Sequence, residues 1–326
     1  MFGGLVNIGG TTCALNTLMQ LIAHSNKLFN SLGDSFEYDS TNQMNTLVWN
    51  ITYVSEALRN ANSVTPGGLV SLIYELFPDN FQSGEQMDIH ELWMLLSSKI
   101  IDEVGVHKKQ KLRKLSNRNI DIYTKVLHDI NKINEGKVSP WLLNIQSIQL
   151  SILKCENDTC GATPWNVEVY NSFEVDIPNE MIDTLVKIDQ LLLNNHTIEN
   201  LPEWKCDTCK HVGGIKQSQI YTLPIILIIV IKRFKISERG VFSKINTQIS
   251  ISEQLSITLN DVTTKYNLIG LGNHYGVYGG GHYTAHVLEN SEWICYDDIN
   301  RSIIDTKKNN IFQANRDAYM VWYETV

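Results

Sequence analysis

Residues 4–20 read GLVNIGGTTCALNTLMQ, a glycine-rich approach that ends at Cys13 and continues as a helical pattern. The apolar residues after the cysteine recur at the spacing of one helix face: Leu15, Leu18, Met19 and Ile22. The pattern predicts that Cys13 lies at a helix N-terminus, which Thr11 or Thr12 could cap. Unpaired N–H groups and the helix dipole favour an anion there, so we expect a lowered pKa for the Cys13 thiol. The alternative is a small buried apolar residue, and this stretch alone leaves both interpretations open.

The composition is that of a globular protein from a reducing compartment. The 326 residues are 43% hydrophobic and 19% charged, which argues against disorder and against a coiled coil. A formal charge of -8 argues against nucleic acid as the main partner. The longest apolar run, residues 223–231, is too short to cross a bilayer, and no signal segment opens the chain. We therefore expect an intracellular protein of the cytoplasm or nucleus without membrane contact. The Asn- and Ile-rich composition leaves a viral source open.

The hydrophobic pattern changes its period near residue 139. Before it, helical spacing dominates, with apolar stripes over residues 47–58, 69–76 and 88–100. Strand-like segments then recur over residues 145–153, 167–170, 173–177, 217–222, 225–234, 266–271, 282–288, 293–297 and 318–323. One short helix is expected over residues 181–194. A helical part followed by a β-rich part predicts an α+β fold. The basic run at residues 107–114 is interpreted as an exposed face rather than a nucleic-acid patch.

Four cysteines form two closely spaced pairs, Cys155-x4-Cys160 and Cys206-x2-Cys209. Pairs of this spacing on two turns can bring four thiolates onto one tetrahedral zinc ion, and such sites are usually structural. The sequence therefore predicts one structural Zn2+ site. The alternatives are four cysteines without metal, or a redox pair formed by Cys206 and Cys209. His211 could replace one ligand, but a surface histidine is the simpler interpretation.

A hairpin late in the sequence carries a histidine and two carboxylates. Three glycines precede the strand expected from His282, and a second strand reaches Asp297 and Asp298. If the intervening turn has four residues, Leu288 pairs with Trp293, and His282 then lies one diagonal step from Asp297 on the same sheet face. A shift of one residue would give this place to Asp298. A histidine that is held by a carboxylate and faces a cysteine can activate that cysteine for attack on an acyl carbon. The simpler alternative is a hydrogen-bonded strand histidine.

These motifs together resemble the ubiquitin-specific protease family of deubiquitinating enzymes, in the same order along nearly the whole chain. The opening stretch is similar to the family's cysteine box, and residues 281–283 with 293–298 are similar to its histidine box. Residues 86–92, which read QMDIHEL, resemble its glutamine-aspartate-glutamate motif. Residues 223–234 resemble its leucine-proline and lysine-arginine-phenylalanine strand. The two cysteine pairs fall where the family carries its zinc-bearing fingers.

The resemblance implies a single catalytic domain over residues 1–326 with the architecture of a papain-like cysteine protease. A helical thumb would span residues 1–138. Residues 139–222 would form the zinc-bearing β fingers and part of the palm, and residues 223–326 the rest of the β-rich palm. The C-terminal tail of ubiquitin, which contains arginines and ends in two glycines, would enter a cleft between thumb and palm.

The resemblance also assigns roles to individual residues. Cys13 would be the nucleophile, His282 would transfer the proton, and Asp297 or Asp298 would hold the histidine. Asn7 would donate to the oxyanion. The residues that would contact the ubiquitin tail are Asp88, Glu91, Gly280, Gly281 and Tyr283. The two acidic residues among them would face the arginines of the tail. Their alternative role is an exposed helix start with a favourable dipole.

The cysteine box departs from the family's pattern at two positions. The family places its oxyanion asparagine five residues before the cysteine, where this chain has Ile8, and Asn7 stands six residues before it. We expect the extra residue to be bulged so that Asn7 still points at the oxyanion. Loss of that donor would reduce turnover about 10²- to 10³-fold. The residue after the cysteine is Ala14, where the family usually has an aromatic side chain.

We therefore expect a thiol-dependent deubiquitinase that cleaves isopeptide or peptide bonds at the C-terminal glycine of ubiquitin. Its partners would be ubiquitin and ubiquitinated proteins, and it would act as a monomer. Two other functions stay open. One is a catalytically weak or silent ubiquitin-binding module, which the altered approach to Cys13 would explain. The other is a thiol protease for a ubiquitin-like modifier.

Overall fold

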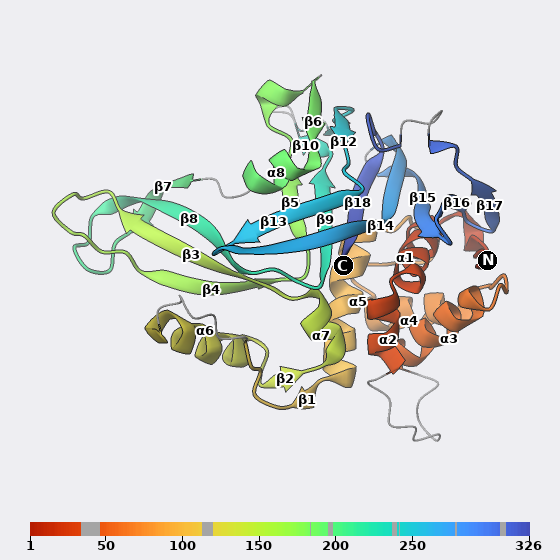
Figure 1. The fold of residues 1–326 in the computed structure, drawn as a ribbon, viewed down its shortest axis with the longest axis horizontal. Coiled ribbons are helices and arrows are strands. Elements are labelled where there is room, and N and C mark those ends of the chain that lie inside the picture. Colours follow the sequence, from red (N-terminus) through yellow and green to blue (C-terminus); the bar gives the residue numbers. More distant parts are fainter. Residues whose placement is uncertain are drawn as a thin grey trace.

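The computed structural model describes residues 1–33, 46–112, 120–182, 184–194, 198–236, 240, 242–277, 279–306 and 311–326 of the chain. In that part, helices dominate up to residue 145 and strands dominate after it (Figure 1). The helices are α1 (Cys13–His24), α2 (Asn26–Gly33), α3 (Leu47–Arg59), α4 (Gly67–Leu76), α5 (Ile89–Val104), α6 (Ile120–Ile133), α7 (Pro140–Ile145) and α8 (Ile188–Asn194). The predicted α+β fold is confirmed. None of the described helices is both long and apolar enough to span a membrane.

Helix α1 lies at the centre of the helical part and is buried on every side from Cys13 to Ala23. It packs against α3 and α5 and also against the strands β14 (Val262–Val277) and β15 (Gly280–Glu289). The predicted helix after Cys13 is therefore present, but the sheet also covers the face that amphipathic spacing would leave to solvent. Thr12 occupies the N-cap position without a capping bond from its side chain. Its hydroxyl instead accepts a hydrogen bond from the N–H of Ile8 at 2.9 Å, so the expected cap by Thr12 is wrong.

An eight-stranded sheet forms the body that packs against α1. Its strands follow the order β17-β16-β15-β14-β18-β9-β5, and β13 pairs with β14 outside that path. The remaining bounds are β5 (Phe173–Asp176), β9 (Ile226–Lys232), β13 (Gln254–Leu259), β16 (Glu292–Asp297), β17 (Asn300–Ile303) and β18 (Ala318–Thr325). Strand β9 is buried from its first residue to Ile231 because it lies inside the sheet, between β18 and β5. This place explains the continuous apolar run in its sequence.

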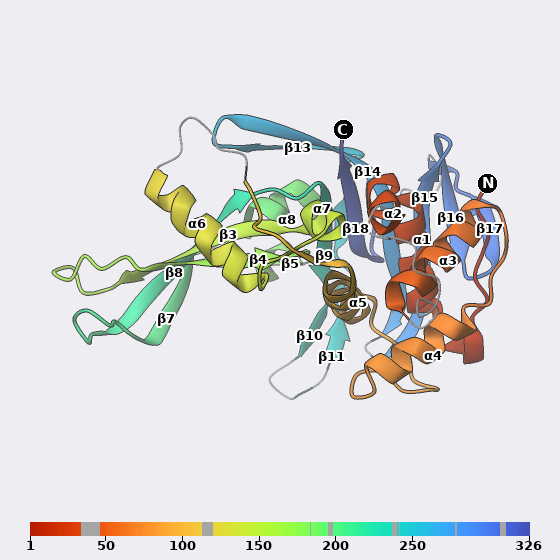
Figure 2. The same ribbon diagram turned by 90° about the horizontal axis from the view of Figure 1, so that it is seen from below.

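A four-stranded sheet extends away from this body, as Figure 1 shows, with the order β4-β3-β8-β7. Its strands are β3 (Ser147–Cys155), β4 (Trp165–Tyr170), β7 (Ile198–Lys205) and β8 (Val212–Thr222). Helix α6 runs beside this sheet (Figure 2) and closes a small apolar cluster with it, formed by Val126, Ile130, Ile148, Leu150, Val167 and Tyr221. Three short strand pairs complete the described sheets: β1 (Val106–His107) with β2 (Lys137–Val138), β6 (Leu185–Lys187) with β12 (Gln248–Ser250), and β10 (Phe234–Ile236) with β11 (Phe242–Lys244).

Two local predictions are wrong in part. The helix expected over residues 181–194 begins only at Ile188, and β6 precedes it and pairs in parallel with β12. Alternating burial explains this strand, because Val186 is buried between two exposed neighbours. The strand expected over residues 225–234 ends at Lys232, and a new strand begins at Phe234. In the basic run, residues 107–109 and 111 are exposed, as predicted, whereas residues 113 and 114 lie outside the described residues.

Arg233 lies between β9 and β10, and its burial accounts for the break between these strands. Its guanidinium donates hydrogen bonds to the backbone carbonyls of Ala318 at 2.6 Å, Ile245 at 3.1 Å, Thr247 at 3.0 Å and Asn315 at 3.3 Å. Burial lowers the pKa of Arg233 to about 10. The arginine of the motif at residues 232–234 therefore acts inside the fold, where it joins β9 to the start of β18.

Candidate active site

The approach to Cys13 folds as a tight turn. Residues Ile8–Gly10 form a 3-10 helical turn whose two glycines have φ angles of 62° and 74°, a region that glycine enters at little steric cost. The Asn7 side chain bends over this turn, because its Oδ1 accepts a hydrogen bond from the N–H of Thr12 at 3.0 Å. The amide nitrogen of Asn7 donates to Oδ2 of Asp298 at 2.9 Å. Asn7 is thus held in one orientation at both ends of its amide.

Cys13 is the first residue of α1 and exposes only 1% of its surface. Burial raises the pKa of the Cys13 thiol. The backbone N–H of Tyr283 lowers this pKa, whereas the charge of Asp298 adds to the increase. The expectation of a lowered thiol pKa is therefore wrong, because the removal of water from around the sulfur outweighs the effect of the helix start. Such a thiol needs a base that takes its proton before it can attack.

His282 directly precedes Tyr283 on β15. Strands β15 and β16 pair with Leu288 opposite Trp293, as the four-residue turn predicts. This register places Nε2 of His282 2.6 Å from Oδ1 of Asp297. Since a carboxylate only accepts hydrogen bonds, Nε2 carries a proton, and Nδ1 is the nitrogen that is left to receive one. The hairpin therefore presents an oriented imidazole beside the strand residue that contacts Cys13.

The carboxylate of Asp298 binds different groups from those that the carboxylate of Asp297 binds. Its Oδ2 is 4.0 Å from Nε2 of His282. The Asp298 carboxylate instead accepts hydrogen bonds from Nδ2 of Asn7 at 2.9 Å and from Nδ2 of Asn16 at 2.8 Å. Its φ angle is 54°, a value that Asp adopts more readily than most residues. Of the two carboxylates, Asp297 orients the histidine, and Asp298 joins the approach turn to α1.

A cavity of about 680 Å³ opens between α5 and the hairpin of β14 and β15. Of the residues expected to contact a substrate tail, the following line it: Asp88, Glu91, Gly280 and Tyr283. Gly281 is outside this lining and is hydrogen-bonded to Gln86, which belongs to it. The sequence did not indicate the aromatic wall, which consists of Phe234, His274 and Tyr319. These three residues come from β10, β14 and β18, so no local pattern unites them.

Asp88 serves both the helix and the cavity. Its Oδ1 accepts hydrogen bonds from the N–H groups of His90 at 2.8 Å and Glu91 at 3.0 Å, which caps α5. Its Oδ2 accepts a hydrogen bond from the hydroxyl of Tyr283 at 3.2 Å. Asp88 is therefore the cap of α5 and also part of the lining of the cavity, while its contact with a substrate tail stays a prediction. Burial lowers the pKa of His274 in the opposite wall to about 4, so this histidine adds no positive charge to the cleft at pH 7. The acidic residues of the cleft are Asp88 and Glu91, at the start of α5.

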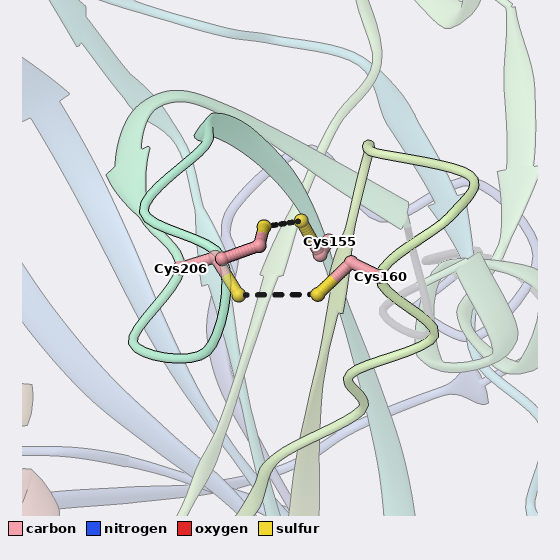
Figure 3. Close-up of side chains that lie close together, drawn as sticks. Cys155, Cys160 and Cys206 are labelled. Atoms are coloured by element: carbon pink, nitrogen blue, oxygen red, sulfur yellow. Dashed lines mark hydrogen bonds between the residues drawn. The ribbon is translucent and has the colours of Figure 1, made fainter.

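The four paired cysteines meet at the outer end of the four-stranded sheet. Figure 3 shows their sulfur atoms facing one another, with Cys155 at the end of β3, Cys160 on the loop that follows it, and Cys206 on a second loop. Sγ of Cys155 lies 3.6 Å from Sγ of Cys209, and Sγ of Cys160 lies 3.7 Å from Sγ of Cys206. All four sulfur atoms lie within 4.8 Å of one another. Among the described residues this group contains cysteines only, so His211 is not one of its members.

The four sulfur atoms fit a tetrahedral metal ion. With Zn–S bonds of about 2.3 Å, the corners of a regular tetrahedron are about 3.8 Å apart, close to the two distances above. The N–H groups of Cys209 and Thr208 lower the pKa of Cys206 to about 6, whereas burial raises the pKa of Cys155 to about 12, so a metal that binds here would displace thiol protons. The short sulfur contacts join cysteines of different loops rather than Cys206 with Cys209. The redox-pair alternative is therefore not favoured.

A cysteine at the start of a buried helix, a histidine–aspartate hairpin beside it, and a helical part against a β-rich part are the features of papain-like cysteine peptidases. The chain belongs to the ubiquitin carboxyl-terminal hydrolase family, whose sequence profile matches residues 3–323. The resemblance to the ubiquitin-specific proteases is thereby confirmed at the level of the family.

Two relatives of this chain are much longer proteins. Ubiquitin carboxyl-terminal hydrolase 15 from Homo sapiens is 30% identical over 167 residues, which cover 48% of this chain and 16% of that protein. Ubiquitin carboxyl-terminal hydrolase 12 from Saccharomyces cerevisiae is 32% identical over 173 residues, which cover 50% of this chain and 13% of that protein. The SAGA Ubp8/Sgf11/Sus1/Sgf73 DUB module bound to ubiquitin aldehyde is similar in structure, with a TM-score of 0.73 at 19% identity. That match covers 99% of this chain and 69% of the other. It shows a shared fold.

Proposed function

We propose that the protein is a thiol-dependent deubiquitinase that hydrolyses isopeptide or peptide bonds at the C-terminal glycine of ubiquitin. One observation carries the proposal, the joint placement of thiol, imidazole and carboxylate. Cys13 on α1 and Tyr283 on β15 lie in one buried cluster, and the residue before Tyr283, His282, bonds to Asp297 at 2.6 Å. Membership of the family and the acidic cleft beside this set support ubiquitin as the substrate.

The mechanism uses His282 first as a base and then as an acid. Its Nδ1 takes the proton of the Cys13 thiol, and Asp297 stabilises the imidazolium and fixes its orientation. The thiolate attacks the carbonyl carbon of the last glycine and forms a C–S bond. The C–N bond to the leaving amine breaks as His282 gives the amine its proton. Water, activated by His282, then hydrolyses the thioester, releases the ubiquitin carboxylate and restores the thiol.

Asn7 is the side chain that donates to the oxyanion in this mechanism. Its amide nitrogen carries two N–H groups, of which one donates to Asp298, and we assign the other to the oxyanion. The backbone N–H groups of Cys13 and Ala14 also lower the pKa of the thiol, as expected of unpaired donors at a helix start. These donors support an active enzyme rather than a silent binding module.

The ubiquitin tail binds in the cleft between α5 and the β14–β15 hairpin. Asp88 and Glu91 accept hydrogen bonds from the arginines of the tail, since carboxylates pair with guanidinium groups in a bidentate manner. Gly280, Gly281 and Tyr283 receive its two glycines, because glycines leave room for a backbone to approach closely. An arginine-containing tail favours ubiquitin over modifiers without basic residues at these positions.

One structural zinc ion is held by Cys155, Cys160, Cys206 and Cys209. When bound, it cross-links the connection after β3 to the connection between β7 and β8. The sheet that carries it forms the fingers, within residues 139–222, next to a thumb of residues 1–138 and a palm completed by residues 223–326. These parts make up one catalytic domain over residues 1–326.

The partners that we propose are ubiquitin and ubiquitinated proteins, with no nucleic acid and no membrane. The chain acts as a monomer in the reducing cytoplasm or nucleus. The six free cysteines suit such a compartment. A viral source stays a prediction from composition alone.

Incubation with ubiquitin that carries a C-terminal electrophile tests this function. We expect a covalent adduct on Cys13 and none in the Cys13→Ala variant. Absence of the adduct, or an adduct that survives this substitution, would contradict the proposal. Hydrolysis of a ubiquitin–fluorophore substrate separates the enzyme from a silent ubiquitin-binding module. Faster turnover of another modifier's substrate would favour the third function over ours.

A further inference from the structure

Residues 86–88 run alongside residues 281–283 and contact them at two points. Nε2 of Gln86 donates to the carbonyl of Gly281 at 2.9 Å, and the N–H of Gly281 donates to Oε1 of Gln86 at 2.9 Å. Two residues further along both segments, the hydroxyl of Tyr283 donates to Oδ2 of Asp88 at 3.2 Å. His282 is the residue between these two contacts.

This end of β15 lacks the support that the rest of the strand receives from β16. Strand β16 pairs with β15 only from Ala285 to Glu289, while β14 pairs along the opposite edge down to Gly280. Residues 280–284 of β15 thus extend past β16. The carboxamide of Gln86 fills part of that edge, because it makes the two bonds that one residue of a neighbouring antiparallel strand would make.

Side chains cannot anchor the strand at this point. Residues 279–281 are all glycine. At Gly281 no side chain fits, since a Cβ atom would lie 2.5 Å from Nε2 of His274 and 2.4 Å from the carbonyl oxygen of Tyr275. The position of the residues before His282 therefore depends on backbone bonds, to β14 on one edge and to Gln86 on the other.

Gln86 is exposed, but the residues that follow it are fixed relative to the nucleophile. Its neighbour Met87 is buried in the same apolar cluster that contains Cys13 and Tyr283. Asp88, the next residue, caps α5. Gln86 thus directly precedes a residue of the core around α1, and its amide links this segment to the catalytic strand.

We propose that Gln86 is a positioning residue that holds His282 at proton-transfer distance from Cys13. The inference rests on the proposed function, because it assigns Gln86 a role in the thiol mechanism. Without the Gln86 amide, the glycine end of β15 is held at one edge only, and His282 moves relative to the sulfur. A misplacement of about 1 Å in a catalytic group can cost about 10²-fold in rate. With the Asp88–Tyr283 contact intact, we expect a loss of about 10- to 100-fold.

Two variants and a matched control test the proposal. Gln86→Ala removes both bonds to Gly281. Gln86→Glu keeps an acceptor for the N–H of Gly281 but places a carboxylate against the carbonyl of Gly281. We therefore expect a similar loss of activity. Gln82→Ala is the control, since Gln82 is exposed in the same segment. The first readout is turnover of a ubiquitin–fluorophore substrate, where kcat falls about 10- to 100-fold in both Gln86 variants and KM changes little.

The second readout needs no ubiquitin: the rate at which iodoacetamide alkylates Cys13. Both Gln86 variants should react more slowly than the control at pH 7, where His282 must take the proton. The difference should vanish at high pH, where hydroxide takes it. An increase in KM at unchanged kcat, or unchanged alkylation at pH 7, overturns the proposal. If wild-type protein turns over no ubiquitin substrate, the proposed function fails, while the alkylation comparison still decides the role of Gln86. Thermal melting shows whether either Gln86 variant has a folding defect. The Gln86 variant whose Tm equals that of Gln82→Ala then decides whether Gln86 positions His282.

Discussion

Replacement of Asp298 by alanine should slow turnover and at the same time make Cys13 easier to ionise. The change removes the acceptor of two hydrogen bonds, from Asn7 at 2.9 Å and from Asn16 at 2.8 Å. Each such bond to a charged group contributes about 1.5–3 kcal/mol. Once released, Asn7 no longer aims its amide at the oxyanion, and the loss of one such donor reduces kcat about 10²- to 10³-fold. Because the charge of Asp298 raises the pKa of the Cys13 thiol, its removal lowers that pKa.

Two assays follow these opposite effects. The kcat for a ubiquitin–fluorophore substrate should fall about 10²- to 10³-fold, while the pH profile of Cys13 alkylation shifts to lower pH. Asp298→Asn is the matched control, because asparagine tolerates the φ angle of 54° and keeps one acceptor oxygen. Its kcat should lie between those of wild type and the alanine variant. A kcat for Asp298→Ala close to that of wild type, or an alkylation profile displaced to higher pH, would refute this reasoning.

Three further predictions concern the histidine partner, the metal site and the stability of the fold. Asp297→Asn should lower kcat about 10²- to 10⁴-fold, because it removes the acceptor 2.6 Å from His282, and near-wild-type kcat would mean that Asp298 can replace it. Metal analysis should find about one zinc per chain, and a chelator should lower Tm and activity together; loss of activity with an unchanged Tm would contradict a structural ion. Burial lowers the pKa of His286 to about 4 in the folded protein. In the unfolded chain, His286 takes up a proton near the ordinary histidine pKa of about 6.5. The free energy of unfolding should therefore fall by about 2 kcal/mol between pH 7 and pH 5. Urea unfolding at pH 7 and pH 5 should show a smaller change in the free energy of unfolding for His286→Gln than for wild type. The same change in both proteins would contradict this prediction.

Features with a strong local pattern could be predicted from the sequence. The helix after Cys13 follows from apolar spacing, and the contact between His282 and Asp297 follows from the length of one turn. The four-cysteine group follows in the same way from two short spacings. In the first two cases the residues lie on one element or on two elements joined by a short connection, so periodicity and turn length determine their relative positions. In the cysteine group only the spacing within each pair is local, because Cys160 and Cys206 are 46 residues apart.

The rest depends on contacts between distant segments. Gln86 and Gly281 are 195 residues apart in the chain, and no spacing rule brings them together. The increased thiol pKa of Cys13 arises because β15 covers α1, and the helix pattern alone suggested the opposite direction. The choice between Asp297 and Asp298 likewise needed the amides of Asn7 and Asn16, which belong to the other end of the sequence.

The hydrogen bond between Asn7 and Asp298 joins residues that are 291 positions apart, and this separation has a consequence during protein synthesis. The ribosome makes the segment with Cys13 well before the hairpin with His282 and Asp298. A growing chain therefore carries its thiol long before it carries the base that removes the thiol proton or the carboxylate that holds Asn7. Contacts of such long range also form late in folding. In the proposed mechanism, the Cys13 thiol therefore gains its base only when β15 packs against α1.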